Sequence, residues 1–232
     1  MISVIAIGFN EEKNIKRLME ALASQTLKAD EIIYVDGNST DNTAKIAGKY
    51  TSKVYFDGRE GAGAARNLGA SKSKGDVLVF IDADSFPDKN WLKNLKKDFD
   101  EGCVAVGGVI LPYDGGTVER FVSYLTNNVF FKLSQHFHFY QLIGSNCAYR
   151  REFFEREKGF SKKFKILEDL DMGLRMRKYG KMYVDRNAVV YSSTRRITQK
   201  GLIKLNLEYA KAYLNYFRNR KIETNYFNEI RH

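Results

Sequence analysis

The chain has 232 residues, with 38 Lys and Arg against 28 Asp and Glu, and a net charge of +10. This length fits one α/β domain with appended helices and suffices for a core that needs no disulfide or metal staples. The two cysteines, Cys103 and Cys147, follow no metal-binding spacing, so they exclude a disulfide framework and favour a reducing compartment. A single bridge between them stays as an alternative. The apolar start at 1–7 lacks a basic lead-in and predicts a buried strand rather than a signal peptide, and no run of about 18 apolar residues predicts a membrane span.

The first hundred residues alternate between strand and helix patterns. Short apolar runs predict strands, and apolar residues at helical spacing predict helices between them. Strands apolar on both faces and separated by helices indicate a mainly parallel, Rossmann-like sheet flanked by helices. The polar segments after the strands should meet at one sheet edge, which brings 8–10, 36–41 and 82–84 together. We expect strands at 2–7, 31–35, 53–56, 77–81 and 103–106, and helices at 15–23, 43–49, 61–71 and 91–99.

From about residue 110 the pattern changes. Residues 119–143 are rich in aromatic side chains, and regular patterns return after them. Gly180 is expected to stop one of the later helices. The elements expected here are a strand and turn at 146–151, helices at 151–158 and 167–178, strands at 182–184 and 188–191, and a helix at 201–220.

Asp82-Ala83-Asp84 ends the apolar strand at 77–81 and provides two neighbouring carboxylates. Carboxylate oxygens are hard ligands of the kind that hold Mg²⁺ or Mn²⁺ against a substrate diphosphate. The small Ala83 lets the backbone and a ligand approach closely. The alternative is that these acids only cap the following turn, and the position after a buried strand favours the metal-binding interpretation.

Two further segments near strand ends carry polar groups. Asp36 follows the strand at 31–35, where an acidic side chain can accept a hydrogen bond from a ribose or a base. The turn formers at 39–41 also suit the N-cap of the next helix, and we expect both roles. Residues 61–67 place small side chains before Arg66, which suits a phosphate at a helix N-terminus but is no Walker loop.

These motifs occur in a fixed order along the chain. They are Ile2-Ser3-Val4-Ile5 with Phe9-Asn10-Glu11-Glu12, then Val35-Asp36 through Asp41-Asn42-Thr43, then Gly63-Ala64-Ala65-Arg66-Asn67, then Asp82-Ala83-Asp84. Together they resemble the family 2 glycosyltransferases over most of the chain, from residue 2 to 196. The resemblance implies a GT-A fold with a C-terminal helical extension. It also implies an inverting transfer of a sugar from a UDP- or GDP-sugar, with Mn²⁺ or Mg²⁺ as cofactor.

The resemblance assigns roles on the donor side of the site. Asp84 would be the main metal ligand, and Asp82 would contact the ribose or the metal. Arg66 would lie near the nucleotide. The residues that would line the base and ribose are Phe9, Glu11 and Asp36.

The resemblance also assigns a catalytic segment. Leu167-Glu168-Asp169 resembles the acidic motif of the family, in which Asp169 would be the general base that takes the proton of the acceptor hydroxyl. Direct displacement at an anomeric carbon needs one ionised carboxylate opposite the leaving group. The alternative is an acidic helix N-terminus that the helix dipole favours. The segment that would shape the acceptor and donor-sugar side contains Gly144, Ser145, Asn146 and Arg150.

Three positions depart from the family pattern. Ile7 stands where a proline is common and Gly37 where a second acid is common, which leaves the base preference open. A histidine that often follows the strand near Val190 is absent, so no third protein ligand for the metal is identified. Arg195 and Arg196 stand there instead, and we interpret them as partners of the diphosphate or of a lipid phosphate. The alternative for this pair is two solvated surface cations.

The C-terminal helix is basic and aromatic: residues 195–221 contain eight Lys and Arg against Glu208 alone. A basic amphipathic helix with tyrosines can lie on an anionic membrane, which suits a polyprenyl-phosphate acceptor. The alternatives are packing on the sheet domain and a homodimer contact. We expect a cytoplasmic protein, at the membrane face if that contact forms. The residues expected on one side of this helix are Leu202, Leu205, Tyr209, Ala212, Tyr213 and Tyr216.

The expected function is a transferase acting on a glycan or polyprenyl-phosphate acceptor, and two other functions are the alternatives. A sugar-phosphate nucleotidyltransferase needs a glycine-rich N-terminal loop with an arginine, which 8–11 does not supply. A non-catalytic module that binds RNA or another polyanion accounts for the net charge but not for three acidic clusters, so no nucleic-acid partner is expected.

His136 and His138 lack a third ligand and are interpreted as surface or interface residues. The transferase hypothesis divides the chain into a nucleotide-sugar half at 1–110, an acceptor and catalytic half at 111–196, and a basic helical tail at 197–232.

Overall fold

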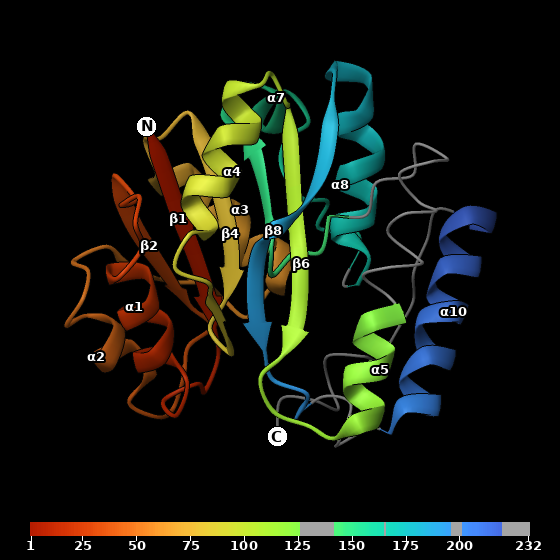
Figure 1. Ribbon diagram of the computed structural model, residues 1–232, viewed down its shortest axis with the longest axis horizontal. Helices are drawn as coiled ribbons and strands as arrows, with labels where there is room; N and C mark the ends of the chain where they lie inside the picture. Colours follow the sequence, from red (N-terminus) through yellow and green to blue (C-terminus); the bar gives the residue numbers. More distant parts are fainter. Residues whose placement is uncertain (126–141, 165, 196–200, 220–232) are drawn as a thin grey trace.

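The computed structural model describes residues 1–125, 142–164, 166–195 and 201–219. These residues form an eight-stranded sheet in the order β3-β2-β1-β4-β7-β6-β8-β5, with helices around it (Figure 1). The strands are β1 Ile2–Gly8, β2 Glu31–Asp36, β3 Val54–Phe56, β4 Val77–Asp82, β5 Ser85–Pro87, β6 Ala105–Pro112, β7 Cys147–Arg150 and β8 Met182–Ser192. The helices are α1 Ile15–Ala23, α2 Thr43–Ala47, α3 Ala62–Lys72, α4 Trp91–Asp100, α5 Thr117–Leu125, α7 Arg151–Arg156, α8 Glu168–Met176 and α10 Leu202–Asn219, with a 3₁₀ turn at Arg177–Tyr179 after α8.

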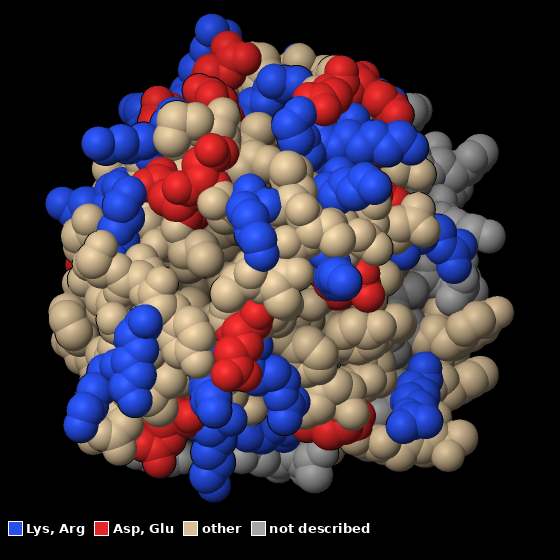
Figure 2. Space-filling model, turned by 60° about the vertical axis from the view of Figure 1, so that its left-hand side comes forward, with Lys and Arg blue, Asp and Glu red and all other residues tan. Residues whose placement is uncertain are grey.

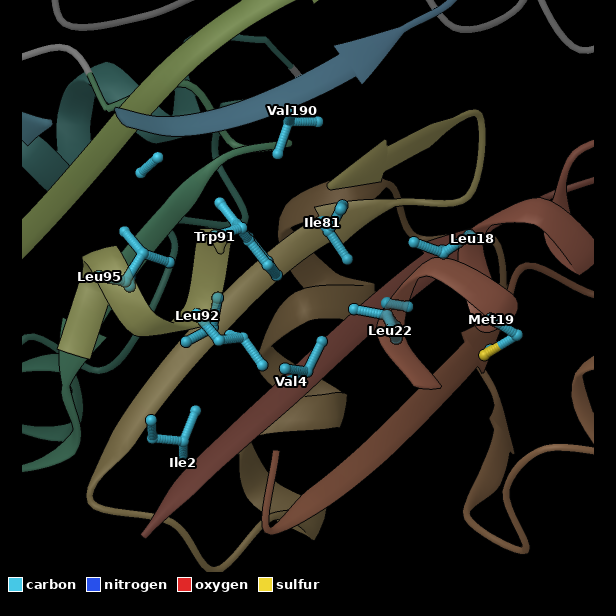
Figure 3. Close-up of a cluster of buried hydrophobic side chains, with 14 of the residues drawn as sticks. Ile2, Val4, Leu18, Met19, Leu22, Ile81, Trp91, Leu92, Leu95 and Val190 are labelled. Carbon is cyan, nitrogen blue, oxygen red and sulfur yellow. The ribbon is translucent and has the colours of Figure 1, made fainter. Parts of the chain in front are cut away.

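Apolar side chains cover both faces of the sheet, as the buried strands require. The side chains of β1 alternate between the two faces of the sheet. Val4 and Ala6 join the cluster under α1, α2 and α4, whereas Ile5 and Ile7 join the cluster under α3, α7 and α8. Figure 3 shows the first cluster, where Trp91 of α4 lies among strand side chains. The predicted α/β fold is therefore confirmed. Among the described helices, none has the length and apolar character that a membrane span requires.

The sheet contains more antiparallel strand pairs than the sequence predicts. In the described part of the chain, β1 pairs in parallel with β2 and β4, and β2 with β3, as expected. Strand β7, however, runs antiparallel between β4 and β6, and β5 is antiparallel to β8. Strands β6 and β8 return to a parallel pair. The sheet is thus mixed, because a strand from the second half of the chain is inserted between two strands of the first half.

Strand β8, in the second half of the sheet, contains a bulge that the sequence pattern does not reveal. Gly108 pairs with Asp185 and Val109 with Val189, so 186–188 bulge out of one continuous β8 where the sequence predicts two strands. A Cβ at Gly108 would lie 1.9 Å from the carbonyl oxygen of Ala188, so this close approach requires glycine. Strand β6 also runs through Gly107 and Gly108, past the predicted end at 106. The short β5 and the helix α5 had no counterpart among the predicted elements.

Asn146 holds the two halves of the fold together. Its side chain is fully buried; Oδ1 accepts a hydrogen bond from Trp91 Nε1 at 2.8 Å, and Nδ2 donates to the carbonyls of Val109 and Ala188, each at 2.9 Å. The carboxamide therefore binds α4, β6 and β8. These contacts give Asn146 a structural role, whereas the resemblance implies a role in substrate binding. Arg150 is likewise structural, because its guanidinium donates to the carbonyls of Cys103 and Phe99.

The two cysteines are both buried and unbridged, so the alternative of a Cys103–Cys147 disulfide is wrong. Each lies in a different apolar cluster of the core, Cys103 under α4 and Cys147 on the opposite face of the sheet. Their thiols therefore act as small apolar side chains of the core.

We predict that Asn146→Ala lowers the free energy of unfolding by about 3 kcal/mol or more. The change removes three buried hydrogen bonds and leaves the Trp91 N–H without its acceptor. Urea unfolding followed by tryptophan fluorescence measures the loss. Ser145→Ala, at the neighbouring half-buried position, is the matched control and should stay within about 0.5 kcal/mol of the wild type. A similar small effect of Asn146→Ala would show that this bridge does not hold the sheet.

Candidate functional site

Three polar loops meet at one edge of the sheet because β1, β2 and β4 are parallel and in register. Gly8 pairs with Asp36, and Ile7 pairs with Asp82, so the segments that follow each strand begin at the same level. The expected convergence of 8–10, 36–41 and 82–84 is confirmed. Figure 1 shows the carboxyl ends of β1 and β4 pointing to the same side of the sheet.

The Asp36 side chain folds the loop that follows it. Its two oxygens accept hydrogen bonds from the N–H and the hydroxyl of Ser39, at 2.5 and 2.9 Å. Asn10 crosses from the β1 loop, since its N–H donates to Ser39 Oγ and its Oδ1 accepts from the Thr40 N–H, both at 2.9 Å. Asp41 accepts from the N–H of Thr43, the first residue of α2, but Asn42 holds the N-cap position and its side chain makes no capping hydrogen bond, so the expected N-cap at 39–41 is wrong. Asp36 is therefore a loop-forming residue at the predicted position.

A cation that the sequence gave no signal for lies beside Phe9. The guanidinium of Arg59 lies 4.6 Å from the centre of the half-buried Phe9 ring, and it donates to the carbonyls of Gly37 and Asn38. Arg59 has a positive φ of 59°, in a loop that no motif marked. An aromatic ring and an arginine next to the Asp36 loop form a surface on which a planar base could stack.

Asp82-Ala83-Asp84 follows β4 as predicted. Ala83 is buried and tightly packed, because a Cβ at Gly8 would lie 2.5 Å from its Cβ. This contact explains why the residue between the two acids is small. Asp84 is also buried, and Ser85 Oγ lies 3.3 Å from its Oδ1.

Arg66 is the centre of the acidic site. Its side chain is only 3% exposed, and it donates through Nη2 to Asp82 at 2.8 Å and through Nη1 to Glu168 at 2.7 Å. A Cβ at Gly144 would lie 2.6 Å from Nη1, so the backbone of that segment closes over the guanidinium. Arg66 thus joins an acid at the end of β4 to an acid at the start of α8.

Glu168 and Asp169 begin α8 beside this cation. Burial raises the pKa of Glu168 to about 7, opposed by Arg66 and assisted by the Asp169 charge. Burial also raises the pKa of Asp169, whereas Arg66 and the N–H groups of Gly144 and Leu170 oppose the rise. Those N–H groups donate to Asp169 at 3.1 and 2.7 Å. Gly144 is therefore at the site, as predicted, but contributes its backbone.

Leu167 precedes these two acids with a left-handed backbone, at a φ of 63°. A non-glycine residue in this region carries a cost of about 1–3 kcal/mol, and such residues cluster at functional sites. Leu167 is buried against α10, so the packing of this side chain holds the strained turn in place. The turn fixes the direction in which α8 begins and therefore where Asp169 lies.

Arg195 connects the end of β8 to the donor-side loops. Its Nη2 donates to Glu11 Oε1 and lies 3.9 Å from Asp84 Oδ2. Burial raises the pKa of Glu11, and the hydrogen bonds from Arg195 and Asn14 oppose the rise. Asp114, a residue that sequence reasoning missed, holds this segment by accepting from Ser193 Oγ and the Thr194 N–H. The predictions for Arg196, His136 and His138 fall outside the described residues.

The donor set at this edge fits a hard divalent cation. Asp82 and Asp84 supply carboxylate oxygens, and a guanidinium already lies against Asp84 and Glu11, which indicates that these acids need a positive partner. Within the described ranges, no cluster of three or more His, Cys, Asp or Glu side chains could hold a metal alone. One or two carboxylates together with substrate phosphates is the arrangement that Mg²⁺ commonly takes.

Comparison with known protein families gives one match over most of the chain. The model described as glycosyl transferase family 2 matches residues 3–157. Glycosyltransferase AglE of Haloferax volcanii is 33% identical over 126 residues, which is 51% of this chain and 39% of that protein. The poly(ribitol-phosphate) beta-N-acetylglucosaminyltransferase TarS of Staphylococcus aureus is 33% identical over 107 residues, 43% of this chain and 19% of that protein. The chain thus spans less than half the length of these two relatives.

Solved structures show the same fold. The crystal structure of S. aureus TarS 1–349 in complex with UDP-GlcNAc has a TM-score of 0.68 at 22% identity, and covers 84% of this chain and 58% of that one. The mannosyltransferase PcManGT from Pyrobaculum calidifontis in complex with GDP-Man and Mn²⁺ has a TM-score of 0.69 at 21% identity, over 90% of this chain and 64% of that one.

We predict that Glu168 makes the protein less stable as pH rises from about 4.5 to about 7. A carboxyl whose pKa is raised by folding binds its proton more tightly in the folded state, so its favourable contribution is complete at low pH and is lost through the folded pKa. Urea unfolding at pH 5 and pH 8 should show a smaller fall for Glu168→Gln than for the wild type. Glu152→Gln, on the exposed surface of α7, is the control. Equal falls in the wild type and Glu168→Gln would contradict the raised pKa.

Proposed function

The chain belongs to glycosyl transferase family 2, and we propose that it transfers a sugar from a UDP- or GDP-sugar to a glycan or lipid-phosphate acceptor with inversion at the anomeric carbon. The observation that carries this proposal is the Arg66 bridge. It brings Asp82, at the end of the donor-side strand, together with Glu168, next to the candidate base Asp169. A donor held at the strand ends would therefore have its sugar close to α8.

The donor side has the chemistry that a nucleotide needs. Phe9 and Arg59 offer a surface for the base, Asp36 orders the loop beside it through Ser39, and Glu11, two residues after Phe9, is a candidate acceptor for base or ribose hydrogen bonds. The loop contacts of Asn10 with Ser39 and Thr40 hold this surface in place before any ligand binds. A preformed surface lowers the ordering cost of binding.

The reaction itself needs one base and a stabilised leaving group. In the proposed step, the acceptor oxygen bonds to the anomeric carbon, the bond to the nucleoside diphosphate breaks, and the hydroxyl proton moves to Asp169. The raised pKa of Asp169 brings the carboxylate closer to the operating pH, which makes it a better base. The Gly144 and Leu170 N–H groups fix the orientation of its oxygens.

We further propose that Asp84 is the main protein ligand of the divalent metal and that Asp82 assists it. When bound, Mn²⁺ or Mg²⁺ would offset the negative charge that the leaving diphosphate gains. Arg195 supports the same role, because its Nη2 lies 3.9 Å from Asp84 Oδ2 and can contact the diphosphate from the end of β8. The Mn²⁺ in the PcManGT complex supports a divalent cofactor in this fold.

Neither alternative function gains support from the fold. The face turned forward in Figure 2 carries Lys and Arg mixed with Asp and Glu, so this face is not the coherent basic surface that a polyanion-binding module needs. A nucleotidyltransferase would need the glycine-rich arginine loop that the Gly8–Glu11 segment lacks. The acidic edge of the sheet fits sugar transfer best.

We predict that one of UDP and GDP binds and that Mn²⁺ strengthens its binding by about tenfold or more. Asp84→Asn should lower the metal-dependent affinity by about 10- to 100-fold, because a charged ligand to the metal is lost. Isothermal titration with each nucleotide, with and without Mn²⁺, measures both effects. Asp100→Asn removes an exposed acid elsewhere, on α4, and should bind like the wild type. If neither nucleotide binds in the presence of metal, the donor site is wrongly assigned.

We predict that Asp169→Asn lowers turnover by about 10²- to 10⁴-fold while nucleotide affinity changes by less than about threefold. Asparagine keeps the shape and the acceptor for the Gly144 N–H but cannot take a proton. The assay is release of UDP or GDP from UDP-GlcNAc or GDP-mannose with a glycan acceptor, whose attacking group is a hydroxyl. Asp171 lies on the same helix as Asp169 and contacts Arg175 of α8 and Tyr216 of α10. Asp171→Asn therefore controls for a general effect on α8. Turnover by Asp169→Asn equal to that of the wild type would remove this residue from the mechanism.

A further inference from the structure

Helix α10 has two different faces, and the tyrosine face is not the exposed one. Ala212 and Tyr216 are buried, and Tyr209 and Tyr213 pack partly buried against the same cluster. The Tyr216 hydroxyl donates to Asp171 at 3.0 Å. The predicted alignment of Tyr209, Ala212, Tyr213 and Tyr216 is confirmed, and this face packs on the protein. Of the alternatives for this helix, packing on the protein therefore accounts for the tyrosine face.

The opposite face of α10 exposes large apolar side chains. Leu207, Leu214 and Phe217 are between 56% and 71% exposed. Their spacings of seven and three residues place them along one side of the helix, with the exposed Ala210 between them. We call these four residues the apolar stripe of α10.

A row of cations runs beside the apolar stripe. Lys204, Lys211 and Arg218 are exposed and seven residues apart, so they lie on one side of the helix. Lys204 and Lys211 each stand three residues before a leucine of the stripe, Leu207 and Leu214, and residues three apart are neighbours on a helix surface, so the two rows are adjacent around the helix. Glu208 is half-buried and lies toward the packed face. The outer surface of α10 is therefore apolar along one line and positive along the next.

Helix α5 repeats the apolar part of this pattern. Val118, Phe121 and Leu125 are exposed at spacings of three and four residues, again along one helix side. Figure 1 draws α5 and α10 on the same side of the sheet, away from β1, β2 and β3. Exposed apolar side chains that form rows on helices mark an interaction surface, whereas scattered single ones need no explanation.

We infer that α10 and α5 bind the surface of an anionic lipid bilayer, with the apolar stripe entering the interface and Lys204, Lys211 and Arg218 against the headgroups. The paired rows select this occupant, because apolar side chains enter the acyl boundary while adjacent cations meet anionic phosphates. A second copy of the same chain would instead bring these cations against each other.

This surface is one helix away from the candidate base. The α10 residues Ala212 and Tyr216 pack on Leu167 and Leu170, which flank Glu168 and Asp169. A bilayer on the outer side of α10 would therefore lie close to the catalytic segment, which suits a lipid-phosphate acceptor. That last step rests on the proposed function, whereas the bilayer contact itself does not.

Flotation of the full chain with phosphatidylcholine vesicles, with and without an equal part of phosphatidylglycerol, tests the inference at physiological ionic strength. We expect binding to the anionic vesicles only. Leu207→Gln with Leu214→Gln should lower the bound fraction at least about fivefold. Lys204→Gln with Lys211→Gln should weaken binding by roughly fivefold for each charge removed. Phe56→Gln removes an equally exposed ring from β3 and should bind like the wild type.

Three outcomes would overturn the inference. They are no flotation of the wild type, equal flotation of the double leucine variant, and a dimer in sedimentation velocity that the leucine changes dissociate without any vesicle binding. Titration of UDP and GDP on the same variants separates this result from the proposed function. Preserved nucleotide binding shows that the variants are folded, and failure of every form to bind nucleotide would count against the donor site while the flotation result stands.

Discussion

The buried guanidinium of Arg66 is the interaction on which the rest of the site depends. A cation that is almost fully buried is tolerable only when carboxylates satisfy it, and removing one partner of such a pair typically costs about 3–5 kcal/mol. Its two partners come from opposite halves of the chain, Asp82 from β4 and Glu168 from α8. The same ion pairs that satisfy Arg66 therefore also fix the distance between the donor-side loops and the catalytic segment.

Gly144 and the left-handed turn at Leu167 both follow from the position of the buried Arg66 guanidinium. Gly144 has no room for a Cβ, because the guanidinium lies where that atom would be. Leu167 takes a left-handed backbone so that α8 can begin with its acids turned toward the cation. The Gly144 N–H then reaches Asp169. Each of these features is unusual alone, and the buried cation gives them one common cause.

The sequence predicts the donor-side half well, because local patterns determine it. Strands apolar on both faces and the helices between them predict a parallel arrangement, and parallel strands bring Asp36 and Asp82 to one edge. The second half depends on long-range pairing. The insertion of β7, the bulge in β8 and the complete use of Asn146 inside the fold arise from contacts between residues far apart in the sequence, such as Val77 with Arg150 and Val109 with Val189, and periodicity carries no signal for them. Arg66 shows the same limit: its motif marked an important residue, but its two acidic partners lie 16 and 102 residues away.

The two arginines of the site differ in how readily an incoming cation could replace them. Arg66 is 3% exposed and its pairs are closed in by Gly144, so a cation from solvent has little access to the Asp82–Arg66 pair. The Arg195 side chain is 42% exposed and lies 3.9 Å from Asp84. Arg195 makes its close hydrogen bond to Glu11 and stands farther from Asp84, and its side chain is partly in solvent, so a divalent ion can replace it beside Asp84 more readily than it could replace Arg66 beside Asp82. The two acids of one short motif are therefore not equivalent: Asp82 serves the fold first, and Asp84 is the acid whose partner can be exchanged. This asymmetry comes from the burial of the arginines and not from the aspartates themselves, so the spacing of the motif could not have revealed it.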